Sequence, residues 1–220
     1  IRSWGLWESS KKPPMVMIPT CVDLNAYQPR PRLDTKTPVF GYVGSLGRGY
    51  LGLELFRFFK RATMVFPGSR LLVVSRTDRE LLQQWLVDAD VDVDQVEMVS
   101  ADPGEVPGQV ARMDVGLCFI EPHYAKKASC PTKLGEYLAA GIPVITNPGI
   151  GDTDAILINT NTGVVIKDFN DQEIDESLRQ VGLLMADETL PERCRQAAEK
   201  VFSLEKGIAA YADLYRGILV

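Results

Sequence analysis

Histidine is nearly absent from this chain, since His123 is the only one among its 220 residues. The four cysteines, at positions 21, 118, 130 and 194, show no Cys-x-x-Cys spacing. A zinc site needs clustered Cys and His ligands, so we expect no metal. Cys118 lies inside an apolar run, which predicts a buried thiol. For the lone His123 we expect a surface or packing role rather than proton transfer.

The chain also lacks an excess of positive charge, because 24 Lys and Arg stand against 29 Asp and Glu, a formal net charge of −5. Binding to nucleic acid needs a basic surface, so we expect no nucleic-acid partner. No apolar stretch reaches the roughly 20 residues that span a bilayer. Reduced thiols and the lack of a secretory signal favour the cytoplasm. Since the first residue is Ile1, we expect a fragment or a processed chain, from which an upstream signal could have been lost.

Short apolar runs alternate with segments of helical spacing along most of the length. The runs predict strands at 39–43, 70–75, 96–99, 115–120, 143–146 and 163–166. The helical spacing predicts helices over 50–64, from Asp78 through Leu86, near 106–112, from Pro131, and from 171 to the end. This alternation predicts an α/β fold with a Rossmann-like parallel sheet and helices on both faces. We expect residues 1–15 to be a linker and residues 16–220 to form the domain.

In such a fold, ligands bind in the loops that follow the strands. The loop after the fourth predicted strand leads into a helix at Pro131, for which Ser129 or Cys130 would be the N-cap. A helix N-terminus binds anions because its first N–H groups are free and its dipole is positive. The ligand implied is a diphosphate. The expected anion site comprises Pro131, the backbone N–H groups of Thr132, Lys133 and Leu134, and the ammonium groups of Lys126, Lys127 and Lys133.

Two further features lie where a nucleotide would bind. The turn after the first strand contains Gly44 and Gly47, which would let the backbone approach phosphates closely; a tight turn without a ligand is the alternative. Glu136 lies one turn into the helix, where its carboxylate could accept hydrogen bonds from two vicinal ribose hydroxyls. The alternative for Glu136 is a surface ion pair with Lys133. The loops after 75 and 99, which include Ser100, would meet the base.

Four segments resemble one protein family. PTKLGEYLAAGIPVI (131–145) resembles the donor-binding signature of the family 4-type retaining glycosyltransferases, which have the two-domain GT-B fold. VMIPTCVDLNAYQP (16–29) is similar to the crossover segment "IPNGVD...F.P", and FGYVGSL (40–46) to the first strand and its glycine loop. FSLEKGIAAYADLYRGIL (202–219) resembles the closing helix of the same fold. The four motifs occur in the family's order and cover residues 16–219.

The resemblance implies the C-terminal half of a GT-B enzyme, which binds a UDP-, GDP- or other nucleotide sugar and needs no cofactor or metal. An N-terminal half would hold the acceptor, so the chain alone is expected to be inactive. The implied role is synthesis of cell-surface polysaccharide or glycoconjugate in the cytoplasm, and a peripheral contact with the inner membrane face through the other half is left open. Glu136 would bind the ribose in this family.

Three positions depart from the family pattern. Ala128 stands where an acid would contact the donor sugar, and Ser45 and Tyr50 stand where Arg and Lys would neutralise the diphosphate. We therefore expect this charge to come from Arg48, Lys127 and Lys133, as stabilisers of the leaving group, with Ser45 beside them in the phosphate loop. Two alternatives stay open. One is a catalytically degenerate GT-B domain that acts as a scaffold. The other is a GT-B epimerase, although an acid at position 128 and cleft histidines, which would favour it, are not present.

Overall fold

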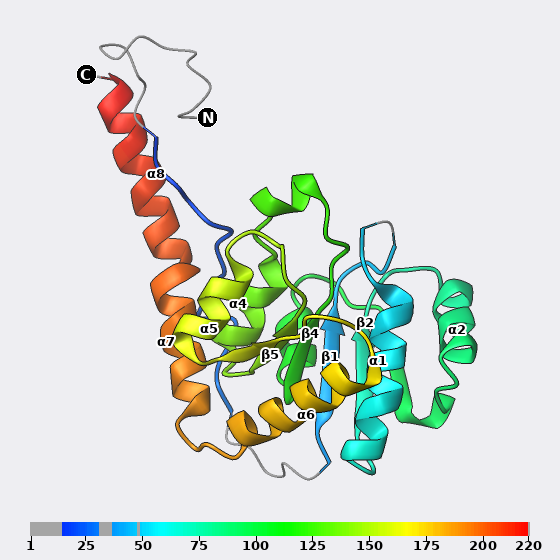
Figure 1. The fold of residues 1–220 in the computed structure, drawn as a ribbon. Coiled ribbons are helices and arrows are strands. Elements are labelled where there is room, and N and C mark those ends of the chain that lie inside the picture. Colours follow the sequence, from blue (N-terminus) through cyan, green and yellow to red (C-terminus); the bar gives the residue numbers. More distant parts are fainter. Residues whose placement is uncertain (1–14, 31–36, 48, 220) are drawn as a thin grey trace.

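A six-stranded sheet with every neighbouring pair parallel forms the centre of the molecule (Figure 1). The computed structural model describes residues 15–30, 37–47 and 49–219. The strands are β1 (Val39–Val43), β2 (Arg70–Val74), β3 (Val96–Val99), β4 (Val115–Cys118), β5 (Val144–Thr146) and β6 (Gly163–Val165). Their order is β3-β2-β1-β4-β5-β6. The predicted α/β fold and the six predicted strands are confirmed, each strand end to within two residues.

Helices cover both faces of this sheet. They are α1 (Gly52–Val65), α2 (Arg79–Asp88), α3 (Val106–Val110), α4 (Thr132–Ala139), α5 (Thr153–Thr160), α6 (Asp171–Met185), α7 (Leu190–Val201) and α8 (Leu204–Leu219), with the 3-10 helices η3 (Val93–Gln95) and η4 (Tyr124–Ala128). The Asp78 side chain accepts from Glu80 N at the start of α2, which makes Asp78 the N-cap of the helix predicted to begin there. Helix α5 and the 3-10 helices η3 and η4 were not predicted from the sequence. The predicted helical tail from 171 is divided into α6, α7 and α8.

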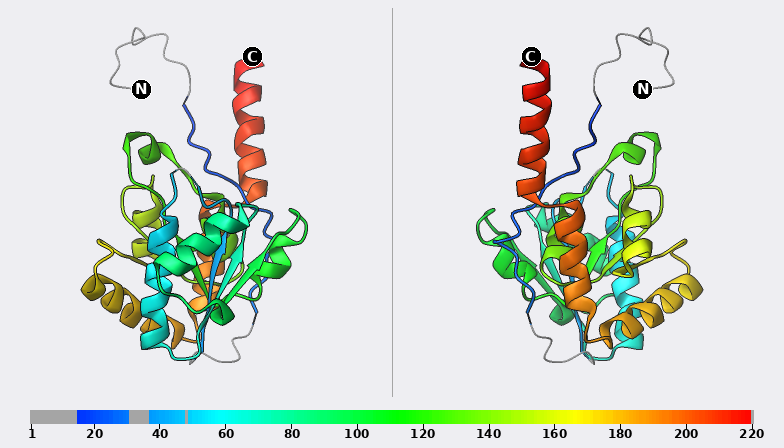
Figure 2. Two further views of the ribbon diagram at one scale, coloured as in Figure 1. Left: turned by 90° about the vertical axis from the view of Figure 1, so that its right-hand side faces the viewer. Right: turned by 90° about the vertical axis from the view of Figure 1, so that its left-hand side faces the viewer.

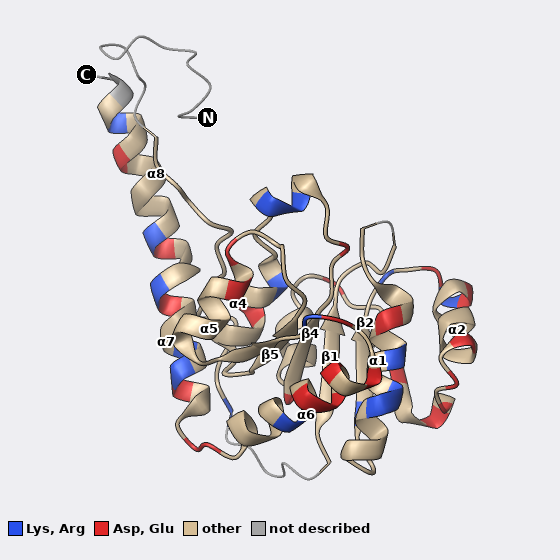
Figure 3. Cartoon of the chain, viewed as in Figure 1, with Lys and Arg blue, Asp and Glu red and all other residues tan. Residues whose placement is uncertain are grey.

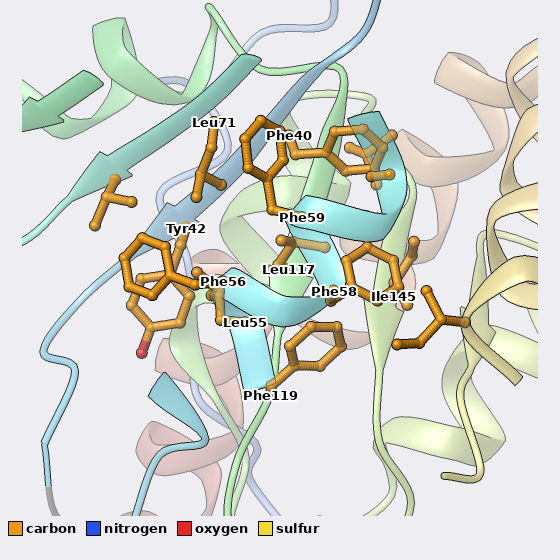
Figure 4. Close-up of a cluster of buried hydrophobic side chains, with 14 of the residues drawn as sticks. Phe40, Tyr42, Leu55, Phe56, Phe58, Phe59, Leu71, Leu117, Phe119 and Ile145 are labelled. Atoms are coloured by element: carbon orange, nitrogen blue, oxygen red, sulfur yellow. The ribbon is translucent and has the colours of Figure 1, made fainter. Parts of the chain in front are cut away.

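One core contains many phenylalanines and joins α1 and α6 to one face of the sheet (Figure 4). The Phe40 ring on β1 lies 6.2 Å from both the Phe58 and the Phe59 ring of α1. Phe58 in turn meets Phe119 at 5.3 Å. These edge-on contacts between fully buried rings fix α1 against the middle of the sheet. The predicted apolar face of this helix is therefore confirmed at Phe58 and Phe59.

The second core lies on the opposite face, where α3, α4 and α7 pack. Cys118 is fully buried within it, and the cysteines of the described residues form no disulfide bond. Beyond this layer, α8 extends away from the body beside the first described residues, as both views of Figure 2 show. A parallel bridge between Val22 and Ser203 ties the crossover segment (16–29) to the start of α8. Among the described residues, no helix is long and apolar enough to cross a membrane.

Candidate nucleotide-binding site

The strand order reverses direction between β1 and β4, and a cavity of about 310 Å³ opens at the carboxyl end of β1. Open parallel sheets bind ligands at such a reversal, since the connecting helices leave on opposite faces there. The wall combines the ends of β1 and β2, the start of α3, one side chain of α4 and one of the crossover segment. It consists of Tyr27, Val43, Gly44, Ser45, Val74, Ser75, Arg76, Ala101, Pro103, Val106 and Glu136.

The loop after β1 is held by its own anchors. Gly44 has a φ of +115°, a conformation that side chains disfavour, and its N–H donates to Val74 O at 2.9 Å. Leu46 is buried, and its N–H donates to Thr77 Oγ1 at 2.7 Å. The Tyr42 hydroxyl donates to Ser45 O at 2.8 Å. The loop therefore has a fixed shape at the mouth of the cavity.

The two glycines predicted to approach phosphates differ from each other. Gly44 combines the left-handed conformation with a place on the cavity wall. Gly47 has no positive φ, and a Cβ added there would meet nothing within 4 Å. The backbone therefore requires glycine at Gly44 and not at Gly47. Arg48, the predicted cation of this loop, lies outside the described residues.

Helix α4 packs closely on the sheet through the ring of Tyr137. Tyr137 packs where β4 has Gly116, and a Cβ at Gly116 would overlap the Tyr137 ring. The Tyr137 hydroxyl accepts from Val43 N at 2.8 Å. Leu134 and Leu138 are fully buried beside it. The sheet thus fixes both the height and the rotation of α4.

The start of α4 differs in detail from the prediction. Pro131 itself is the N-cap, with an extended ψ of 122°, so the expected cap at Ser129 or Cys130 is wrong. Pro131 cannot continue the helix backwards, and its carbonyl accepts from Leu134 N at 3.1 Å. Leu134 N–H is therefore engaged, and Thr132 and Lys133 supply the N–H groups of the first turn. Thr132 is exposed.

Lys133 lies inside the protein rather than on its surface, with 7% of the residue exposed. Its Nζ lies 3.8 Å from the centre of the Tyr42 ring and 4.6 Å from that of Tyr50. This ammonium has no hydrogen-bond partner among the described residues. It lies beneath Gly44, where an added Cβ would be 3.4 Å from Nζ. Burial lowers the pKa of Lys133 to about 8, because the charged form loses its hydration.

Two more lysines stand on η4, which is blue above the sheet in Figure 3. The Lys126 Nζ lies 5.6 Å from the Tyr50 ring, on which the Lys133 ammonium also packs. Lys127 is exposed, and its Nζ lies 6.0 Å from the Tyr124 ring. Lys126 and Lys133 therefore converge on Tyr50 next to the glycine loop, whereas Lys127 points to a surface ring. Cation–π contacts position the ammonium groups of Lys126 and Lys133 but do not neutralise their charge, so this charge remains available to bind an anion.

Glu136 is half-buried on the cavity wall. Its Oε1 accepts from the Tyr27 hydroxyl at 2.9 Å. Burial raises the pKa of Glu136, and the Tyr27 bond and the Lys133 charge oppose that rise. The alternative of a surface ion pair with Lys133 is wrong, because Lys133 is buried and the described residues contain no such pair. Sequence reasoning missed Tyr27, which lies 109 residues away from its partner.

The opposite end of the cavity is formed by the loops after β2 and β3. Arg76 donates to Ala101 O at 3.2 Å and pairs with Asp102, which ties the two loops together. Arg76 and Ala101 both line the wall. Ser100 is exposed and is not part of that wall, unlike its neighbour Ala101. The described residues contain no group of three or more His, Cys, Asp and Glu side chains that could hold a metal ion.

The sequence profile of the family described as "Glycosyl transferases group 1" matches residues 26–201. The chain belongs to this family. The match runs from the crossover segment through α7 and includes every residue of the cavity wall. Among curated proteins, no sequence matches this group 1 glycosyltransferase chain significantly.

Solved structures show the same fold at low sequence identity. A sucrose-phosphate synthase from Thermosynechococcus elongatus superposes with a TM-score of 0.70 at 18% identity, covering 92% of this chain and 52% of the other. An Anabaena protein in complex with UDP and glucose gives 0.68 at 14% identity, covering 89% and 55%.

The isolated C-terminal domain of a Francisella tularensis group 1 glycosyltransferase gives a TM-score of 0.58 at 17% identity, covering 82% of this chain and 95% of that domain. Our group 1 chain thus spans about half of the two longer proteins. It has the fold of a GT-B glycosyltransferase C-terminal domain.

Proposed function

We propose that this chain is the donor-binding half of a glycosyltransferase, which binds a nucleoside-diphosphate sugar for transfer of the sugar to an acceptor. The observation that carries the proposal is the buried Lys133 ammonium beneath Gly44, which has no hydrogen-bond partner among the described residues. A buried cation without an acceptor is unfavourable, and an anion above Gly44 would relieve it. A diphosphate there would contact the glycine loop and the first turn of α4 together.

The same groups suit the chemistry of glycosyl transfer. The bond between the sugar C1 and the phosphate oxygen breaks through an oxocarbenium-like transition state, and negative charge grows on the departing diphosphate. In our proposal Lys133, Lys126 and the Thr132 N–H stabilise that charge, and Lys127 and Arg48 add to the field. Fixed charges of this kind lower the barrier because they need no reorganisation during the reaction. Retention at C1 is proposed on the family resemblance alone, and Ala128, which replaces the acid that would contact the donor sugar, weakens this part of the proposal.

The nucleoside fits the rest of the cavity in this proposal. Glu136 would accept from the two ribose hydroxyls, and the base would lie against the wall formed by Arg76 and Ala101. The Anabaena complex holds UDP and glucose, which makes UDP the first nucleotide to test. No side chain of the wall distinguishes the bases by an evident pattern of donors, so GDP and ADP belong in the same test.

The acceptor half would pack against α8. Four apolar side chains of this helix are well exposed, at 41% to 63%: Leu204, Ile208, Tyr211 and Tyr215. Met17 of the crossover segment is 83% exposed. A stripe of this kind on a projecting helix favours burial against another domain of the same longer chain. We further propose a cytoplasmic enzyme of polysaccharide or glycoconjugate synthesis, which contacts a membrane through that other half.

Calorimetric titration of the chain with UDP, GDP, ADP and UDP-glucose tests the proposal. We expect micromolar-to-millimolar binding of at least one nucleotide, which weakens with added salt because the contacts are ionic. Glu136→Ala should weaken that binding by about 10- to 100-fold, the value of hydrogen bonds to a charged acceptor. Glu192→Ala, an exposed helical carboxylate on α7, is the matched control and should bind like the wild type.

Two outcomes would contradict parts of the proposal. If no nucleotide binds, the donor-binding function is wrong, and the scaffold alternative takes its place, with Ala128, Ser45 and Tyr50 as marks of a lost activity. If Glu136→Ala binds as the wild type does, the donor function stands and the ribose assignment falls. The chain alone should transfer no sugar, as a transfer assay with UDP-glucose and simple acceptors would show.

A further inference from the structure

Tyr27 reaches the cavity from the crossover segment and forms a hydrogen bond with Glu136. Tyr27 is 7% exposed and lies on the cavity wall. The hydroxyl donates to Glu136 Oε1 at 2.9 Å. Burial and the nearby carboxylate raise the pKa of Tyr27 well above 10, so the hydroxyl stays a donor at every relevant pH. The crossover motif that this segment resembles has Phe at the corresponding position, so the hydroxyl is a feature of this chain.

The backbone of Tyr27 is itself fixed from below. The guanidinium of Arg195 on α7 donates to Tyr27 O at 2.6 Å and to Leu24 O at 2.8 Å. It also reaches Ala139 O, at the end of α4, at 3.3 Å. One side chain therefore joins the segment that carries Tyr27 to the helix that carries Glu136. The two partners of the Tyr27–Glu136 bond belong to one rigid arrangement.

This arrangement constrains the carboxylate. Free glutamate side chains rotate among several conformers, and a ligand that must fix one of them binds more weakly as a result. With Oε1 held by Tyr27, the plane of the Glu136 carboxylate is set before a nucleotide arrives. Oε2 and the second lone pair of Oε1 then remain for two further donors. A pair of vicinal hydroxyls supplies that number of donors.

We propose that Tyr27 is a positioning residue for ribose recognition, which presets the Glu136 carboxylate for the two hydroxyls of a nucleoside diphosphate. The proposal rests on the donor-binding function argued above. It differs from a purely structural role, in which the Tyr27 hydroxyl would only tie the crossover segment to α4. A structural tether affects every ligand of the cavity alike, whereas a positioning role affects only ligands that carry the hydroxyls.

Tyr27→Phe separates these roles, because it removes one oxygen and keeps the buried ring. The probes are UDP and 2′,3′-dideoxyuridine diphosphate, titrated by calorimetry against the wild-type chain and the variant. We expect UDP to bind the variant about threefold to tenfold more weakly, the fold-change that corresponds to ordering one side chain. The dideoxy nucleotide should bind both proteins equally within a factor of two. Tyr211→Phe removes an exposed hydroxyl on α8 and should change neither affinity.

A double-mutant comparison adds a second measurement. In the Glu136→Ala background, Tyr27→Phe should leave the UDP affinity unchanged, because no carboxylate remains to be oriented. Equal weakening of UDP and the dideoxy nucleotide, or an unchanged UDP affinity in Tyr27→Phe, would overturn the positioning role and leave the donor-binding function intact. A wild-type chain that binds neither nucleotide, nor GDP or ADP, would overturn both.

Discussion

Lys133→Met should make this protein more stable, although it removes a charge that we assign to function. The wild-type ammonium is buried without a hydrogen-bond acceptor among the described residues, and burial lowers its pKa from 10.5 to about 8. A shift of that size corresponds to about 3 kcal/mol against the charged form in the folded state. Cation–π contacts with the Tyr42 and Tyr50 rings offset part of this penalty, by up to about 2 kcal/mol when the cation is desolvated.

Methionine has the length of lysine and packs well on aromatic rings. We therefore expect Lys133→Met to raise the free energy of unfolding at pH 7 by about 1–3 kcal/mol, the penalty less the lost cation–π contacts. The gain depends on pH. Between the folded pKa near 8 and the unfolded value of 10.5, the unfolded chain holds more protons than the folded one, so wild-type stability rises with pH there.

Urea unfolding at pH 7 and pH 9.5, followed by tryptophan fluorescence, measures both effects. The difference in the free energy of unfolding between Lys133→Met and the wild type should be largest at pH 7 and about 2 kcal/mol smaller at pH 9.5. Lys127→Met, which replaces an exposed lysine, should change stability by less than about 0.5 kcal/mol. A variant less stable than the wild type at pH 7, or a gap that is the same at both pH values, would refute the account of Lys133 as an unsatisfied buried charge.

Two further predictions follow from the same site. UDP affinity should fall about tenfold from pH 7 to pH 9 in calorimetric titrations, because the anion binds protonated Lys133 and the protonated fraction of Lys133 drops about tenfold over this range for a pKa near 8. The Lys133→Met variant should bind UDP weakly at both pH values. An equal fall in affinity in this variant would contradict the assignment. Gly44→Ala should lower the free energy of unfolding by about 1–2 kcal/mol in thermal unfolding, because Gly44 has a φ of +115°. Gly47→Ala should leave the free energy of unfolding unchanged. Equal losses of stability at both positions would show that the loop conformation is not the cause.

The architecture was predictable because its signals are local. Buried parallel strands consist of continuous apolar runs, and the runs at 39–43 and 96–99 coincide with β1 and β3. Helix α5 was missed for a physical reason. Its only buried residues are Thr153 and Leu157, while Ile158 is 65% exposed, so its apolar residues define no single face. A short helix without such a face gives no periodic signal.

The candidate site was predictable in outline and not in its electrostatics. Pro131 indicated a helix start, and Glu136 follows from its position on that helix. The burial of Lys133 could not be predicted from the sequence, because lysine is almost always exposed. Its ammonium packs on the Tyr42 and Tyr50 rings, which are distant from it in the sequence. The contact between Tyr27 and Glu136 joins residues 109 positions apart, so no local sequence pattern predicts it.

The contacts of the crossover segment affect where the junction should be placed in a chimera of two group 1 glycosyltransferases. Arg195 and Glu136 bind a tyrosine that precedes β1, so the proposed nucleotide-binding site includes a residue that lies before the first strand. A chimera whose junction follows Pro29 would take the residue at position 27 from the other parent. A junction that precedes residue 16 would keep Tyr27, Arg195 and Glu136 from one parent. Donor preference should then travel intact with the transplanted half.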